Sequence, residues 1–177
     1  MNLKNYNPVS RNWRVLLQEM PEEWVNSLPT AEEIWVGGNA GEMSWKLSKE
    51  NGNFMFRHYR WNKSDNFPEI FSGMMKHLQA EDISMFAGDN DTTVGSLGWH
   101  VDDYHVWAFN IEGETEWEYF DLMSGTFKSE TVKPGYILTM PLGISHRVKV
   151  LSEYRTSVSM ITRYGASIPR TPCMVSP

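Results

Sequence analysis

The chain is organised around one short stretch, Gly98-Trp99-His100-Val101-Asp102-Asp103-Tyr104-His105-Val106-Trp107. Along an extended strand, residues two positions apart point to the same face, so His100 and Asp102 can bind one metal ion from one side. A third ligand must come from elsewhere, and the segment Pro141-Leu142-Gly143-Ile144-Ser145-His146 supplies a candidate in His146. Two histidines and one carboxylate on one face of a metal leave its opposite positions open, as in non-haem Fe(II) sites. The sequence therefore predicts an open metal site with three protein ligands.

The size and composition indicate a globular protein with one core. At 177 residues, of which 41% are hydrophobic and 21% charged, the chain is long enough to fold as a single domain. Its aromatic fraction of 13% favours a mainly β architecture with large buried rings. We expect one domain over 1–177, with a helical and hairpin part over 1–82, a strand-rich core over 83–162 and an irregular tail over 163–177.

The charge and the cysteine content restrict the partners and the compartment. A net charge of −6 argues against a general nucleic-acid binder, because phosphate contacts need clustered Lys and Arg. The single cysteine, Cys173, cannot form an internal disulfide, which suits a reducing cytosol. No signal-peptide pattern and no run of eighteen apolar residues occurs, so we expect a cytoplasmic protein without a membrane partner.

Short apolar segments separated by turn residues recur after residue 83, a pattern typical of a β-sandwich or barrel. The expected strands are 83–86, 104–111, 116–121, 126–132, 136–140, 147–151 and 155–162. Before them, apolar spacing predicts helices over 11–18 and 68–78, and helix starts are expected at Pro21 and Pro29. Asn51-Gly52 predicts a hairpin between strands over 42–49 and 53–61.

The motifs of the core resemble those of the cupin-type oxygenases of the JmjC group, and their ribosomal-oxygenase branch most of all. The residues that carry the resemblance are His100-Val101-Asp102, Gly113, Trp117, the segment Lys133-Pro134-Gly135-Tyr136-Ile137-Leu138-Thr139-Met140-Pro141, and His146. The resemblance covers roughly residues 83–162. It implies a double-stranded β-helix, which is a jelly roll of eight strands in two sheets, with the N-terminal helices packed on one sheet.

The resemblance also implies an activity. Fe(II) would be held by His100, Asp102 and His146, with 2-oxoglutarate as co-substrate and O2 as oxidant. Such a dioxygenase converts 2-oxoglutarate to succinate and CO2 while it hydroxylates a C–H bond, and demethylation is the same reaction on an N-methyl group. The group resemblance favours a protein side chain as substrate, and a small molecule is the competing expectation.

The residue that would bind the distal carboxylate of 2-oxoglutarate departs from the pattern of the group. Members of the group commonly carry Lys or Arg where this chain has Thr115. A substitute is available, because Arg155 and Ser157 resemble the Arg-x-Ser pair on the last strand of other 2-oxoglutarate oxygenases. A planar guanidinium can hold a carboxylate through two parallel hydrogen bonds, and the serine hydroxyl adds a third donor. The alternative is an exposed Arg155 paired with Glu153 or Asp121.

Further polar residues are expected to point to the same side of the sheet as His100 and Asp102. Asn110 and Tyr104 are candidate residues of the co-substrate pocket, with core filling the alternative for the Tyr104 ring, and Thr115 can still add a hydroxyl contact. The His105 side chain points to the opposite face of the strand, so metal binding is the less expected role. We expect His105 either to be partly exposed or to lie behind the metal ligands. Core or pocket-wall positions are expected for Trp99, Trp107 and Trp117.

Two other classes of function compete with the oxygenase. A metal-dependent cupin can isomerise or cleave its substrate without 2-oxoglutarate, and Thr115 at the cation position favours that class. A β-roll without catalytic activity can bind a ligand or a partner, but the intact set of His100, Asp102 and His146 argues against it. The sequence leaves the oligomeric state open.

Overall fold

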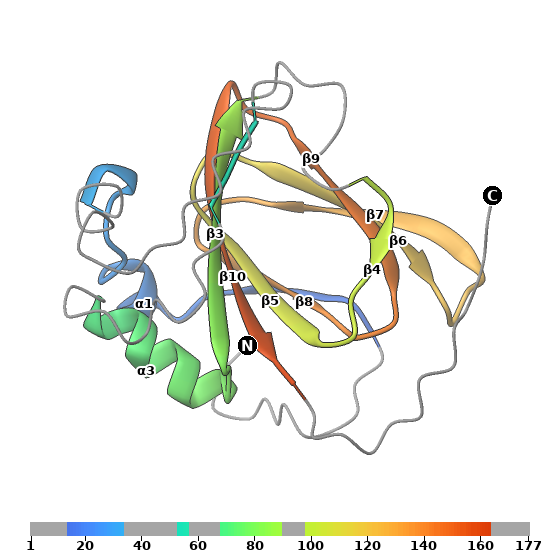
Figure 1. Ribbon diagram of the computed structural model, residues 1–177, viewed down its shortest axis with the longest axis horizontal. Coiled ribbons are helices and arrows are strands. Elements are labelled where there is room, and N and C mark those ends of the chain that lie inside the picture. Colours follow the sequence, from blue (N-terminus) through green and yellow to red (C-terminus); the bar gives the residue numbers. More distant parts are fainter. Residues whose placement is uncertain (1–13, 34–52, 57–67, 90–97, 164–177) are drawn as a thin grey trace.

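The computed structural model describes residues 14–33, 53–56, 68–89 and 98–163, and their strands form two antiparallel sheets that pack face to face (Figure 1). The larger sheet has six strands in the order β1-β8-β5-β10-β3-β2, and the smaller has four in the order β4-β9-β6-β7. The elements are β1 (Leu16–Glu19), α1 (Glu22–Val25), β2 (Asn53–Phe56), α3 (Glu69–Leu78), β3 (Asp82–Asp89), β4 (His100–Val101), β5 (His105–Glu112), β6 (Thr115–Asp121), β7 (Thr126–Val132), β8 (Tyr136–Met140), β9 (Ser145–Val150) and β10 (Tyr154–Thr162). No helix within these residues is long and apolar enough to cross a membrane.

Helices α1 and α3 cover the outer face of the six-stranded sheet, on the side away from the small sheet (Figure 1). Phe71, Met74, Met75 and Leu78 form the buried stripe of α3, at the spacing of one face of an amphipathic helix. They pack against Ile83, Met85, Trp107, Phe109, Ile137, Val158 and Met160 of the sheet. The expected packing of N-terminal helices on one sheet is confirmed.

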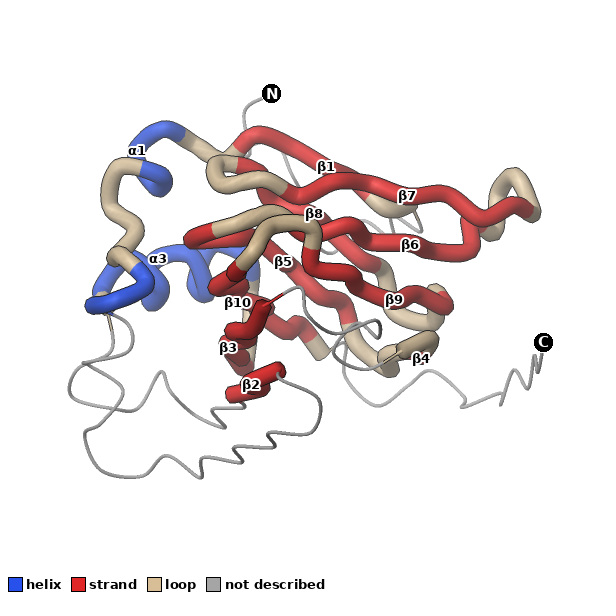
Figure 2. The backbone as a smooth tube through the Cα atoms, turned by 90° about the horizontal axis from the view of Figure 1, so that it is seen from above, coloured by secondary structure: helices blue, strands red, loops and turns tan. Residues whose placement is uncertain are grey.

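A second core of side chains lies between the two sheets. Figure 2 shows the backbone of these sheets from above. Strand β5 joins the two cores, because Trp107 and Phe109 point to the helices whereas Val106 and Ala108 point to the small sheet. Every residue of this strand from His105 to Asn110 is buried. A strand covered on both faces explains the nearly continuous apolar run after the metal-binding motif.

The helix expected over 11–18 is wrong where the structure describes this segment. Residues Leu16–Glu19 form β1, which pairs antiparallel with β8 and sets Leu17 opposite Leu138. Leu17 packs on the core between the sheets, and Met20 packs on the helix-covered core. A few apolar residues at helical spacing also fit a short edge strand with two covered faces. Pairing with β8 satisfies the backbone of this segment and decides between the two structures.

The other helices and strands expected within the described residues agree with the structure. Helix α3 occupies the segment predicted at 68–78, α1 begins after Pro21, and a helical turn begins at Ala31. All seven strands expected after residue 83 are present. Strand β2 confirms the start of the strand expected over 53–61. The rest of that strand, the strand over 42–49, the Asn51-Gly52 turn and the tail after Arg163 lie outside the described residues.

Gly113, in the turn between β5 and β6, fixes this turn against the start of β10. Its φ is +74°, and a Cβ atom added there would lie 2.1 Å from the backbone oxygen of Tyr154. Gly113→Ala should therefore lower the free energy of unfolding by about 2–4 kcal/mol, because both the backbone conformation and the close contact exclude a side chain. Urea unfolding checks this. The control is Gly125→Ala, whose φ of +68° is similar but whose added Cβ meets no atom within 4 Å. An equal loss in the two variants would contradict the role of the contact.

Candidate metal centre

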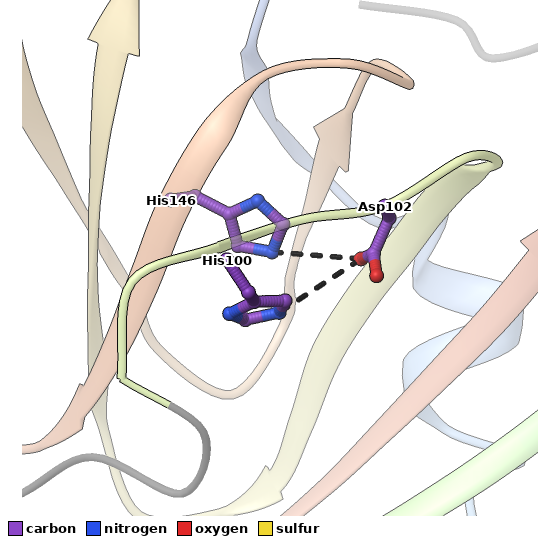
Figure 3. Close-up of side chains that lie close together, drawn as sticks. All are labelled: His100, Asp102 and His146. Carbon is purple, nitrogen blue, oxygen red and sulfur yellow. Dashed lines mark ion pairs between the residues drawn. The ribbon is translucent and has the colours of Figure 1, made fainter. Parts of the chain in front are cut away.

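The two strands β4 and β9 bring the predicted ligands together. Their antiparallel register sets His100 directly opposite His146, and Asp102 follows at the end of β4. Ligand atoms of the three side chains all lie within 4.8 Å of one another. The Asp102 Oδ2 atom is 3.6 Å from His146 Nε2 and 4.0 Å from His100 Nε2. Both rings point toward the carboxylate (Figure 3), so one ion can reach all three residues.

Backbone hydrogen bonds orient the two imidazole rings. His100 Nδ1 lies 2.9 Å from the Gly98 carbonyl oxygen, and His146 Nδ1 lies 2.9 Å from the Ile144 carbonyl oxygen. A carbonyl can only accept, so each Nδ1 carries the proton and each Nε2 presents its lone pair to the cluster. Burial lowers the pKa of His146 and favours the neutral ring that a metal requires. These contacts are the usual support of metal-binding histidines.

Aromatic residues support β9 on both faces. On the inner face Trp117 stacks on His146, with ring centroids 5.5 Å apart and an interplanar angle of 18°. On the outer face the Arg147 guanidinium lies 5.0 Å from the centre of the Trp99 ring and donates from Nε to Glu118. Trp117 lines the pocket and Trp107 is in the core, as expected. The expectation for Trp99 is wrong: the side chains on either side of His100 face outward, and Trp99 is 43% exposed.

His105 is a neighbour of the metal centre and not one of its three residues. Its side chain is buried, so of the two expected alternatives the partly exposed one is wrong. The Leu142 N–H donates to His105 Nδ1 at 2.9 Å, and the Gly143 N–H donates to the Asp102 carbonyl oxygen at 2.9 Å. These two bonds connect the turn before His146 to the segment that runs from the end of β4 to the start of β5.

Burial lowers the pKa of His105 to about 4, and this predicts a pH dependence of stability. Between pH 6.5 and 4 the unfolded chain binds a proton at His105 that the folded chain does not, so stability falls as the pH falls through this window. The variant His105→Gln keeps an acceptor for the Leu142 N–H but cannot titrate. From pH 7 to pH 5 the wild type should lose about 2 kcal/mol more than this variant. Urea unfolding at the two pH values measures the difference, and parallel losses would contradict a neutral buried His105.

The three candidate metal ligands share one cavity of about 160 Å³ with Arg155. Arg155 is only 3% exposed, so the expected alternative of an exposed arginine paired with Glu153 or Asp121 is wrong. Its guanidinium lies 5.7 Å from the centre of the Phe86 ring. Burial lowers its pKa to about 10, and the group is still charged at pH 7. Within the described residues Arg155 forms no ion pair, and its Nε atom has no hydrogen-bond partner.

The other predicted co-substrate residues fall into two groups. Tyr104 lines the cavity beside the metal residues, and its ring lies 5.9 Å from the Arg163 guanidinium. Ser157, Asn110 and Thr115 instead bond to one another: Ser157 Oγ donates to Asn110 Oδ1 at 2.7 Å, and Asn110 Nδ2 donates to Thr115 Oγ1 at 3.1 Å. These three are buried but do not line the cavity.

Sequence reasoning missed the wall that β3 contributes. Asp82, Ser84 and Phe86 line the cavity, and β3 pairs along its length with β10. Arg163, the last described residue after β10, lines the mouth with its Nη2 atom 3.7 Å from Asp82 Oδ2. The alternation Asp-x-Ser-x-Phe is visible in the sequence, but only the pairing with β10 shows which face lines a site.

The two antiparallel sheets pack as a jelly-roll sandwich, with the His-Asp-His cluster between them. This arrangement defines a mainly β protein of the cupin fold with a candidate metal site. The expected fold class is confirmed. No protein-family model matches the chain, and no curated protein matches its sequence. Solved structures do match. The X-ray structure of E. coli ycfD aligns with a TM-score of 0.64 and 14% identity over 94% of this chain and 54% of that chain.

Further matches have the same fold. A structure of YcfD, a ribosomal oxygenase from Escherichia coli, in complex with cobalt and 2-oxoglutarate aligns with a TM-score of 0.62 and 16% identity, over 94% of this chain and 53% of that chain. Acireductone dioxygenase from Bacillus anthracis with a cadmium ion in its active centre aligns with a TM-score of 0.50 and 12% identity, over 89% of this chain and 83% of that chain. The chain thus spans about half the length of YcfD. At these identities the likeness shows the fold alone.

Proposed function

We propose that this chain is an Fe(II)- and 2-oxoglutarate-dependent oxygenase that hydroxylates or demethylates a protein side chain or a small molecule. His100, Asp102 and His146 would hold the iron. Arg155 would hold the distal carboxylate of 2-oxoglutarate, and Tyr104 would lie beside the co-substrate.

The observation that carries the proposal is that Arg155 is buried in the cavity of the candidate ligands and has no ion pair among the residues that the structure describes. A charged group removed from water without a partner costs several kcal/mol. An anionic ligand that enters the cavity would remove this cost. In the same cavity, two imidazoles and one carboxylate form a ligand set that suits iron. A dicarboxylate that binds a metal at one end and a guanidinium at the other fits both features.

The residues of the chain have separate tasks in this proposal. Bound iron with 2-oxoglutarate and O2 supplies the oxidising chemistry, and the protein supplies orientation and a shielded pocket. The hydrogen bonds to Gly98 and Ile144 hold both Nε2 atoms in their binding direction. Trp117, Val106, Val148 and Ile161 give the pocket apolar walls that exclude water. Arg155 fixes which end of the dicarboxylate lies at the metal.

An anaerobic titration tests the proposal. Fe(II) and 2-oxoglutarate added together should produce a visible metal-to-ligand charge-transfer band that neither produces alone. Succinate, which lacks the keto oxygen, is the matched control and should give no band. A protein that binds Fe(II) but gives no band with 2-oxoglutarate would contradict the proposal.

A metal-dependent cupin without a co-substrate is the second candidate, and Thr115 favours it. This residue stands where the JmjC group commonly carries a cation, and here its hydroxyl bonds to Asn110 outside the cavity. This candidate predicts metal binding without any charge-transfer band. A protein that binds no metal would remove both candidates and leave a binding module.

A further inference from the structure

Strand β7 forms an outer edge of the four-stranded sheet (Figure 2). Within the described residues it pairs with β6 alone. Its residues from Thr126 to Ser129 are exposed. An exposed edge offers unpaired backbone N–H and C=O groups to another strand, and many proteins protect such an edge or use it for assembly.

Exposed apolar side chains gather beside this edge. Phe127 of β7 is 67% exposed, and its ring centroid is 5.2 Å from that of Trp99 and 5.2 Å from that of Phe120. Leu122 and Met123, in the turn between β6 and β7, are 59% and 68% exposed. Apolar side chains grouped in this way on a folded surface mark an interaction site more often than scattered ones do.

The sequence of β7 is complementary to itself. The strand reads Thr126-Phe127-Lys128-Ser129-Glu130-Thr131-Val132, and Ser129 is its middle residue. In a two-fold antiparallel pair, residues that face one another lie on the same side of the sheet, so the axis must pass through one residue. With the axis at Ser129 the five residues from Phe127 to Thr131 of each strand are paired, and the buried Val132 at the end of the strand stays outside the pairing. Lys128 then faces Glu130 of the second copy, and Phe127 faces Thr131.

The charges select this register against its neighbours. An axis at Lys128 would set two lysines face to face, and an axis at Glu130 would set two glutamates face to face, both unfavourable. Glu130 forms no ion pair within the described part of the chain, so its carboxylate is available to a lysine of a second copy. Lys128 forms an ion pair with Asp121 of its own chain. In the dimer, Lys128 would interact with both Asp121 and Glu130 of the second copy.

We propose that two copies of this chain associate through their β7 edges, antiparallel about Ser129, and join the two four-stranded sheets into one sheet of eight. We assign a second copy of the chain to this edge because, in an antiparallel pair of β7 strands, Lys128 of each copy faces Glu130 of the other. The strand pair is small compared with a standard interface, so we expect a dissociation constant of about 1–100 μM. The interface does not include the metal residues and is independent of the proposed activity.

Charge reversal tests this proposal by sedimentation equilibrium at protein concentrations around the expected dissociation constant. Glu130→Lys places lysine opposite Lys128, and Lys128→Glu places glutamate opposite Glu130. Each variant alone should dimerise at least about tenfold more weakly than the wild type. The double variant Lys128→Glu/Glu130→Lys restores opposite charges and should recover wild-type affinity within a few fold. Glu153→Lys, the same change at an exposed position outside β7, is the control and should leave the dimer unchanged.

Mixing the two single variants gives the sharpest readout. All facing charges are then opposite in the mixed pair, so the two variants should form a heterodimer although each alone is mainly monomeric. A misfolded variant cannot show this behaviour. The proposal is overturned by a wild type that stays monomeric up to about 200 μM, roughly twice the upper end of the expected range of dissociation constants. It is also overturned by a dimer that Glu130→Lys does not weaken, or by single variants that do not associate when mixed.

Discussion

The variant His146→Ala should bind Co(II) and Mn(II), used as redox-stable substitutes for Fe(II), more than about 100-fold more weakly than the wild type. The loss of a residue that only supports a ligand typically costs about 10–100-fold in metal affinity, and the loss of a ligand should cost more. His146 is 1% exposed and faces His100 across the strand pair. No other His, Cys, Asp or Glu within the described residues lies close enough to join the three-residue cluster.

Isothermal titration calorimetry of the metal-free protein measures this effect. His105→Gln is the matched control, because His105 is also buried beside the site but belongs outside the cluster. The control should change the affinity only a few fold. Wild-type affinity in His146→Ala would disprove the assignment of the ligand, and a similar large loss in both variants would point to a general disturbance of the turn at Leu142.

The sequence predicted the cluster of candidate metal ligands because the alternation of side chains along a strand is a local rule. His100 and Asp102 are two residues apart, and their shared direction follows from extended backbone alone. The register that sets His146 opposite His100 depends on the paths of the strands that lie between them in the sequence. No local rule supplies that register, and the resemblance to an oxygenase group supplied it instead.

The predicted co-substrate residues show that the alternation of side chains along a strand is not sufficient to predict the hydrogen-bond partner of a residue. Arg155 and Ser157 lie two residues apart in β10 and are both buried, as alternation predicts. Ser157 nevertheless bonds to Asn110 of β5, next to an irregularity in the pairing of β10 with β5 between Thr156 and Ser157. A cross-strand partner of this kind depends on which residue the neighbouring strand places opposite, and the sequence does not specify it. Thr115 is engaged by the same amide of Asn110.

The errors in the fold have a common cause. In the segment around Leu16, and at Trp99, the sequence showed apolar residues but not the surface that would cover them. Leu17 lies in β1, which pairs with the edge of β8. Trp99 lies on the outer face of the small sheet, where Arg147 and Phe127 contact its ring. The apolar character of a residue predicts that its side chain will be in contact with other apolar groups. The tertiary structure determines which groups these are.

The variant Arg155→Met should weaken 2-oxoglutarate binding by about 10²–10³-fold, because the loss of one partner of a buried, hydrogen-bonded charge pair costs about 2–5 kcal/mol. The charge-transfer band at increasing 2-oxoglutarate measures the affinity in the presence of Fe(II). Arg163→Met is the matched control: it removes the same charge from the mouth of the same cavity, and we expect a change of only a few fold. Equal losses in the two variants would indicate a general effect of positive charge.

The stability of the same variant should change in the opposite direction. The guanidinium of Arg155 is buried without an ion pair among the described residues. An apolar side chain of similar length removes this cost, so Arg155→Met should stabilise the ligand-free protein by about 1–3 kcal/mol in urea unfolding. An arginine with a purely structural role would give the reverse, because its removal would break contacts that the fold needs. Lower stability together with unchanged 2-oxoglutarate affinity would therefore exclude Arg155 as the carboxylate-binding residue. Higher stability with lost affinity is the result expected of a charge that the fold maintains for a ligand.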